Sequence, residues 1–169
     1  LEESLAFAMQ FHEYTFREDA DTFIPTYMDA ATGDATTLSY VDLSCTLGQI
    51  TWADFEGTRL TNPMASIEEV SPSYNVILLR YVMTGVNENH EVEYYNVEEY
   101  YRLRKAPNRM YVLNFERRMN QIFRVENTFL RNASAIVLGI RDSAVEYKAN
   151  EAGDSIAFVQ EGELWSYNR

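Results

Sequence analysis

The stretch YNVILLRYVMTGVNENHEVEYYNVEEYYRLRKAPNRMYVLNF, residues 74–115, decides the fold of this chain. Its first part, residues 74–84, is apolar on both alternating sets of positions apart from Asn75 and Arg80. Continuous apolar character of this kind is typical of a strand that is covered on both faces or lies centrally in a sheet. We therefore expect a long, largely buried strand at the centre of the domain.

Two further strands follow directly. Residues 85–90 form a turn rich in Gly and Asn, and residues 92–104 form a long strand with tyrosines on both alternating sets. Pro107 turns the chain again, and residues 110–115 return it. The sequence thus predicts an antiparallel meander of three strands.

Helices are expected before this meander. Residues 2–18 fit a helix because apolar side chains recur at spacings of three and four. A shorter helix is expected over residues 22–31, with Pro25 tolerated in its first turn and Gly33 ending it. The face of the first helix with this spacing comprises Leu5, Ala8, Met9, His12 and Phe16, and it is widened by Phe7, Phe11 and Tyr14.

Four segments carry mixed or weaker patterns. Residues 36–43 and 49–55 are rich in β-branched and aromatic side chains, which predicts strands. Residues 64–70 lie between two prolines, and we expect one or two helical turns there. Residues 115–131 fit either a helix or a strand, and we adopt the helix because of the spacing of its apolar residues.

The C-terminal part reads as short β segments separated by turns. These segments either extend the main sheet or form a small unit of their own. They are expected at residues 135–140, 144–148, 156–160 and 164–167.

These elements define an α+β fold, with N-terminal helices packed on a curved antiparallel β-sheet and extra C-terminal β-hairpins. A chain of 169 residues suits a single domain, which we place at residues 1–169. Its main body is expected over residues 1–131, and the hairpin extension over residues 132–169. The hydrophobic content of 46% is ordinary for a globular protein.

Several kinds of chemistry are excluded or unsupported. The seven glycines are never closer than nine residues apart, which rules out the glycine-rich loops that cradle phosphates. With two His and one Cys, a zinc site of the usual type is nearly excluded. There is no Gly-x-Ser-x-Gly elbow and no calcium-binding loop. We therefore expect no metal and no cofactor, and we favour a protein that is not an enzyme.

If the chain is an enzyme, His12 is the residue to test as a general acid or base. It lies on the apolar face of the first expected helix, where a structural core histidine is the more ordinary interpretation. Its carboxylate partner would be Asp42 or Asp54, each beside aromatic residues in an expected strand region. Both carboxylates also fit solvated positions.

Charge is distributed unevenly along the chain, whose formal net charge is −12. Residues 1–101 carry 18 acids and 3 bases, whereas residues 102–131 carry 8 bases and 2 acids. Pairing of these bases with Glu98 and Glu99 across the sheet is one explanation. The other is a face that binds an acidic protein partner or a second copy, formed by Arg102, Arg104, Arg117, Arg118, Arg124, Tyr100 and Tyr101. The net charge argues against nucleic-acid binding.

The order of elements resembles the nuclear transport factor 2-like (cystatin-like) superfamily. Two N-terminal helices precede long antiparallel strands in residues 5–115, and the sequence QEGELW at residues 160–165 is similar to the closing hairpin of such folds. The resemblance implies helices packed into the concave face of a curved sheet. That superfamily includes enzymes as well as binding and dimerisation modules, so it does not select a function.

Our leading hypothesis is a non-catalytic binding or assembly domain. Because the chain begins at Leu1 rather than Met, we expect it to be part of a larger or processed protein. With only two Lys among its fourteen bases and with plentiful Tyr, Asn, Thr and Ser, the composition leans towards an extracytoplasmic or cell-surface location. The alternatives are a small-molecule-binding domain or enzyme with a pocket between helix and sheet, and a structural piece of a surface or virion protein.

Overall fold

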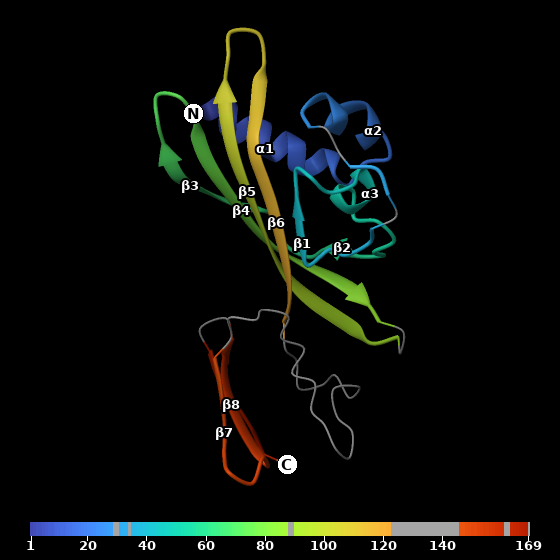
Figure 1. Cartoon of the computed structure of the whole chain (residues 1–169), viewed down its shortest axis with the longest axis vertical. Coiled ribbons are helices and arrows are strands. Elements are labelled where there is room, and N and C mark those ends of the chain that lie inside the picture. Colours follow the sequence, from blue (N-terminus) through green and yellow to red (C-terminus); the bar gives the residue numbers. More distant parts are fainter. Residues whose placement is uncertain (29–30, 34, 88–89, 123–145, 161–162, 169) are drawn as a thin grey trace.

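The structure is a computed structural model that describes residues 1–28, 31–33, 35–87, 90–122, 146–160 and 163–168. It confirms the α+β class: short N-terminal helices lie against a large antiparallel sheet, and a smaller sheet follows near the C-terminus. Figure 1 shows the long strands running side by side with the helices gathered on one face.

The main sheet has six strands in the described residues, in the order β1-β6-β5-β4-β2, with β3 also paired to β4. Every pairing in it is antiparallel. The expected meander of three strands is confirmed as β4, β5 and β6. The strands are β1 Tyr40–Asp42, β2 Thr58–Arg59, β3 Met64–Val70, β4 Asn75–Val86, β5 Val92–Lys105 and β6 Met110–Ile122.

Four helical segments are described: α1 Glu2–Tyr14, α2 Ala20–Phe23, the 3-10 helix η1 Ile24–Thr26, and α3 Leu47–Ile50. Helix α1 crosses β4 and β5 and buries its aromatic side chains against them. The ring of Phe11 contacts the rings of Tyr101 and Phe115, at centroid distances of 5.8 and 5.4 Å. These contacts fill most of the space between α1 and the sheet, because aromatic side chains bury large apolar areas.

Residues 115–122 belong to strand β6, so the expected helix is wrong over this part; residues 123–131 lie outside the described residues. The physical reason is the register with β5, in which Glu99 lies opposite Arg117 and Val97 lies opposite Met119. Phe115 and Met119 have helical spacing, but they also alternate along a strand, and the long neighbouring strand decides between the two patterns.

The strand expected over residues 49–55 is also wrong, because the chain forms α3 and a turn there. Thr46 and Gln49 make a reciprocal capping box, with the Thr46 hydroxyl accepting from the Gln49 backbone N–H at 3.2 Å. Such a box satisfies backbone groups that a helix start leaves unpaired, and it overrides the β-propensity of the following residues. The strand expected over residues 36–43 is confirmed only as the short β1.

Residues 64–70 form β3 rather than helical turns, and this strand carries a register shift between Ile67 and Glu69. Helix α1 ends at Tyr14, earlier than expected. The second expected helix is the shorter pair α2 and η1, with Pro25 in the first turn of η1.

The C-terminal segments pair with one another and not with the main sheet in the described residues. They form a sheet in the order β7-β8-β9, with β7 Tyr147–Ala149, β8 Ser155–Gln160 and β9 Glu163–Asn168. Of the two possibilities open from the sequence, the separate β unit is therefore the observed one. The segment expected at residues 135–140 lies outside the described residues.

Candidate functional site

A buried polar cluster lies beneath α1, with the Glu99 carboxylate at its centre. One oxygen of Glu99 accepts a hydrogen bond from the Tyr81 hydroxyl at 2.7 Å. The other accepts from Tyr101 at 2.7 Å and lies 2.9 Å from Nδ1 of His12. All four side chains are buried. A buried carboxylate with three hydrogen-bond partners is fully satisfied, so it keeps its charge without exposure to water.

The hydrogen-bond partners of His12 indicate the role of each ring nitrogen. Its Nε2 lies 2.7 Å from Nη1 of Arg59, which in turn donates to Glu13 at 2.6 Å. A guanidinium only donates, so His12 Nε2 accepts, and the single ring proton is on Nδ1, where it donates to Glu99.

Arg117 supplies the positive charge in the same layer of the core. It lies opposite Glu99 in the strand register, and its side chain is 0% exposed. Its two terminal nitrogens donate to the carbonyls of Ile50 and Gln49 at 2.9 and 2.6 Å, while its Nε has no hydrogen-bond partner in the described structure. The guanidinium stacks 3.6 Å above the ring of Trp52. Both carbonyls belong to the last residues of α3, and that of Gln49 also accepts from the Trp52 backbone N–H at 3.3 Å, so this arginine helps to cap the helix.

Burial shifts the pKa values of this cluster. It raises the pKa of the Glu99 carboxyl, but the hydrogen bond and electrostatic attraction of His12, the charge of Arg117 and the Tyr101 hydroxyl outweigh it, so the pKa lies below its usual value. Burial, together with the Glu99 charge, raises the pKa of Tyr81 and Tyr101 well above that of a free phenol. Burial lowers the pKa of Arg117. The cluster is therefore arranged to hold one carboxylate charge and to keep both phenols protonated.

We expect Glu99 to contribute to acid unfolding. A carboxyl whose pKa is lower in the folded than in the unfolded state stabilises the fold above the unfolded pKa of about 4.3. This contribution is lost as the pH falls through the folded-state pKa. The free energy of unfolding, measured in urea from neutral to acidic pH, should fall less steeply for Glu99→Gln than for wild type. Glu98→Gln is the control and should keep the wild-type slope; equal slopes in all three proteins would contradict this assignment.

The His12–Glu99 pair is not placed for catalysis. Both side chains are 0% exposed, and the remaining ring nitrogen of His12 is occupied by Arg59. A general base must reach the proton that it removes, directly or through one water. No ring or carboxylate atom of this pair is free to do so in the described structure. The cluster therefore orders the core.

The carboxylates expected as partners of His12 lie elsewhere. Asp42 accepts hydrogen bonds from the backbone and hydroxyl of Ser44 at 2.8 and 2.6 Å, and these bonds lower its pKa. Asp54 is exposed in the turn after α3. Neither forms a hydrogen bond or ion pair with His12. The true partner, Glu99, was detectable in principle as a charged residue within the alternating set that otherwise faces the core.

The residues expected to bind a partner are divided between the two faces of the sheet. Arg117 and Tyr101 are buried on the helix-covered face, so they are not available to a partner. Arg118 lies on the opposite face, 3.4 Å from Glu116. The other placements are Arg102 over the ring of Tyr74 at 3.8 Å, Arg104 over the ring of Tyr111 at 4.9 Å, Tyr100 on the open face, and Arg124 outside the described residues.

Beside the buried cluster, a hollow of about 510 Å³ opens to solvent. It lies between the end of α1, the start of α2, helix α3 and the far end of β4. We call it the aromatic hollow, because three of its lining side chains are aromatic rings. Its apolar lining consists of Phe16, Ala20, Leu47, Trp52, Phe55 and Met83, and its other lining residues are Thr15, Arg17, Glu18, Asp21, Thr51 and Gly57.

Two glycines make room for one wall of this hollow. A Cβ atom at Gly57 would lie 2.0 Å from the ring of Phe55, and one at Gly85 would lie 2.7 Å from it. Real atoms do not approach so closely, so any larger residue would displace the ring. Tyr95 contacts the same ring edge-on, with centroids 5.6 Å apart. The position of Phe55 thus depends on glycine in β4 and in the preceding loop.

The other wall is held by strained backbone. Trp52 and Ala53 have φ angles of 73° and 47°, in the left-handed region that non-glycine residues rarely adopt. The Trp52 ring lies between the Arg117 guanidinium and the ring of Phe16, whose centroid is 5.0 Å away. Its Nε1–H donates to the Thr15 hydroxyl at 3.2 Å. Strain of this kind persists only where the surroundings hold it, and it is enriched at ligand-binding sites.

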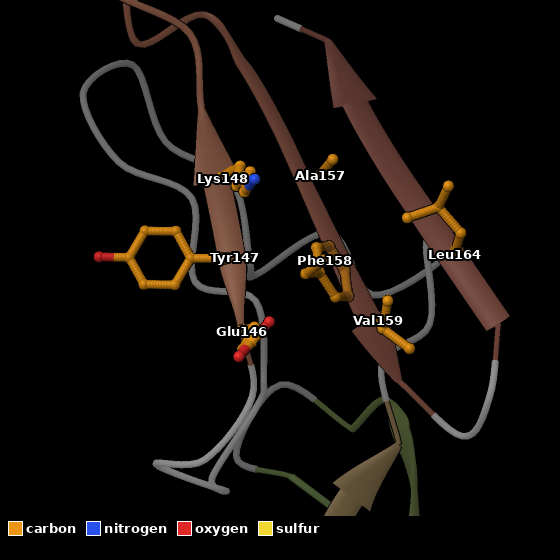
Figure 2. A pocket seen from close by; sticks show the side chains of 7 residues that line it. All are labelled: Glu146, Tyr147, Lys148, Ala157, Phe158, Val159 and Leu164. Atoms are coloured by element: carbon orange, nitrogen blue, oxygen red, sulfur yellow. The ribbon is translucent and has the colours of Figure 1, made fainter.

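A second hollow, of about 610 Å³, lies at the C-terminal sheet. Figure 2 shows its lining residues, with Phe158 and Val159 on the middle strand and Leu164 on β9. Phe158 is buried, whereas Tyr147, Val159 and Leu164 are 68%, 51% and 75% exposed. Its charged lining residues are Glu146 and Lys148. This region presents apolar side chains to solvent with few polar groups directed at a ligand.

Within the described residues, no group of three or more His, Cys, Asp or Glu side chains is placed to hold a metal ion. The same part of the chain contains no helix long and apolar enough to cross a membrane.

Comparison with protein-family models, with curated proteins and with solved structures gives no match for this chain. The resemblance to the nuclear transport factor 2-like superfamily thus stays a prediction from the order of elements. The fold and the site define an α+β domain whose sheet is covered by helices on one face and whose helix–sheet boundary opens at the aromatic hollow.

Proposed function

We propose that this chain is a non-catalytic binding domain whose ligand site is the aromatic hollow. The observation that carries the proposal is the contrast between two neighbouring regions. The His12–Glu99 cluster is closed to solvent and fully hydrogen-bonded, whereas the hollow beside it is open and lined by Phe16, Trp52 and Phe55. Ligand sites are usually concave and largely preformed. This hollow is concave, and its lining combines three aromatic rings with polar and charged side chains.

The volume and lining of the hollow favour a small ligand with an aromatic or aliphatic body. A volume of about 510 Å³ lies within the range of about 300–1,000 Å³ that such sites occupy. Rings in the hollow would contact Phe55 and the edge of Phe16. A fragment of the size of 2-phenylethanol is expected to bind with a Kd on the order of 1 mM.

Phe55→Ala tests this proposal. Removing the ring that rests on Gly57 and Gly85 should weaken binding of 2-phenylethanol by about fivefold, because the ligand loses an aromatic contact. Ligand-observed NMR titration measures the effect. The matched control is Tyr147→Ala, which removes an exposed ring on the C-terminal sheet and should leave the Kd unchanged. Unchanged affinity in Phe55→Ala, or no saturable binding to the wild type, would rule out the aromatic hollow as the site.

A second candidate function is assembly with a protein partner or a second copy. The exposed apolar side chains of the C-terminal sheet favour it, because clustered exposed apolar residues often mark interaction surfaces. The positive charges of Arg102, Arg104 and Arg118 would add electrostatic orientation towards an acidic partner. An extracytoplasmic location stays a prediction from composition.

Assembly through the C-terminal sheet is tested with Val159→Lys combined with Leu164→Lys. If the wild-type chain self-associates, sedimentation velocity over a dilution series should show a monomer for this variant under conditions where the wild type is larger. The control is Arg102→Glu with Arg118→Glu, which changes the open face of the main sheet instead. Arg117 is excluded from such a test because its replacement would disturb the core. Persistent association of the double lysine variant would exclude the C-terminal sheet as the contact.

A further inference from the structure

The charges at the rim of the aromatic hollow are unbalanced. Glu18 and Asp21 line it, are exposed, and make no hydrogen bond or ion pair within the described residues. The one basic residue of the lining, Arg17, donates two hydrogen bonds of 2.7 Å to the carboxylate of Asp19. Its charge is therefore neutralised locally, and two carboxylates remain available at the opening.

We propose that the aromatic hollow selects a small organic cation, with its apolar body against the rings and its positive group at Glu18 and Asp21. This inference rests on the proposed function, because it assigns a charge to the ligand of the same site. It names a chemical class that combines a hydrocarbon or aromatic body with one ammonium or similar group.

Three physical effects favour such a ligand over a neutral one of the same shape. The two carboxylates attract a positive charge at close range, and the effect of each is modest because the rim is exposed. The negative face of the Phe55 ring favours a cation nearby, whereas the ring of Phe16 already lies against Trp52 and the Arg59 guanidinium. The formal net charge of −12 also raises the local concentration of cations around the protein. The same effects disfavour an anionic ligand.

The hollow itself constrains how the cation enters. Trp52 is covered on one side by Arg117 and on the other by Phe16, so its ring faces are not available. A positive group placed deep in the hollow would approach Arg117 and be repelled. The apolar body is therefore expected inside, against Phe55 and Met83, and the charged group outside at the carboxylates.

The test compares 2-phenylethylammonium with 2-phenylethanol, which have nearly the same size and shape. The wild-type protein should bind the ammonium probe about fivefold more tightly at low salt. The preference should shrink at high salt, because exposed charges are screened. In the double variant Glu18→Gln with Asp21→Asn the two probes should bind equally. The matched control, Glu68→Gln, removes an exposed carboxylate on β3 and should keep the wild-type preference.

The outcomes separate the two proposals. If both probes bind the wild type with equal affinity, the cation assignment is wrong while the hollow remains a ligand site. If neither probe binds, both proposals fail. If the ammonium probe is preferred but the double variant keeps that preference, Glu18 and Asp21 do not select the ligand and the assignment is also wrong.

Discussion

Replacement of Arg117 by alanine is expected to lower the free energy of unfolding by about 3–5 kcal/mol, whereas Arg118→Ala should change it by less than about 0.5 kcal/mol. Arg117 is completely buried, stacks on Trp52 and donates to the end of α3. Its loss leaves the Glu99 charge buried without a compensating cation and removes the support of the strained Trp52 backbone. Urea denaturation monitored by circular dichroism measures both variants.

Arg118 is a strict control because it adjoins Arg117 in the sequence but points to the opposite face of β6. Its side chain is 60% exposed, forms a long ion pair with Glu116 and lies 5.8 Å from the centre of the Tyr40 ring. Solvent-exposed pairs of this type contribute about 0–1 kcal/mol. A similar loss of stability in the two variants would show that the buried charge is not important to the fold.

The second large effect is expected for Glu99→Gln, which should destabilise the protein by about 3 kcal/mol. Glutamine keeps the shape, but its amide group donates where the Tyr81 or Tyr101 hydroxyl needs an acceptor. The positive charge of Arg117 is then left uncompensated in the core. The measurement is the same urea denaturation, made at neutral pH where Glu99 of the wild type is ionised.

Glu98→Gln provides the neighbouring control. Glu98 lies on the open face and forms an ion pair with Arg80 at 2.6 Å, so its replacement should change stability by less than about 1 kcal/mol. Combining Glu99→Gln with Arg117→Met should destabilise less than the sum of the two single changes, because each removes the cause of the other's penalty. Additive effects would contradict a direct electrostatic coupling between Glu99 and Arg117.

The long strands were predictable because their signal is strong and local. Apolar residues occupy both sets of alternating positions in β4, and tyrosines occupy both sets in β5. These patterns indicate strands and do not fit a helix. The chain order then requires antiparallel neighbours, since short turns join them. The α+β class and the meander follow from these residues alone.

The predicted secondary structure is wrong where one segment fits two local patterns. In β6, Phe115 and Met119 satisfy both a helical and an alternating spacing, and only pairing with β5 distinguishes them. Around Trp52, β-propensity indicates a strand, but the Thr46–Gln49 capping box and the left-handed turn prevail. Strand pairing is a tertiary effect and helix capping is a local backbone effect. Residue propensities include neither of them.

The candidate site was harder to predict than the fold. His12 was identified, but its partner is 87 residues away and belongs to a strand whose register decides which carboxylate faces inward. The aromatic hollow depends on positive φ angles at Trp52 and Ala53 and on the absence of a Cβ at Gly85. No short sequence motif encodes these features, so they can be recognised only in the three-dimensional structure.

The most direct test of the central claim is a two-dimensional ¹H–¹⁵N NMR titration of the intact chain with 2-phenylethylammonium. The protein has two indole N–H groups: Trp52 in the aromatic hollow and Trp165 in the C-terminal sheet. Binding in the hollow predicts a saturable shift of the Trp52 indole signal, which Phe55→Ala weakens, while the Trp165 signal stays in place. A shift of Trp165 alone, or no saturable shift of either signal, would contradict a ligand site at the aromatic hollow.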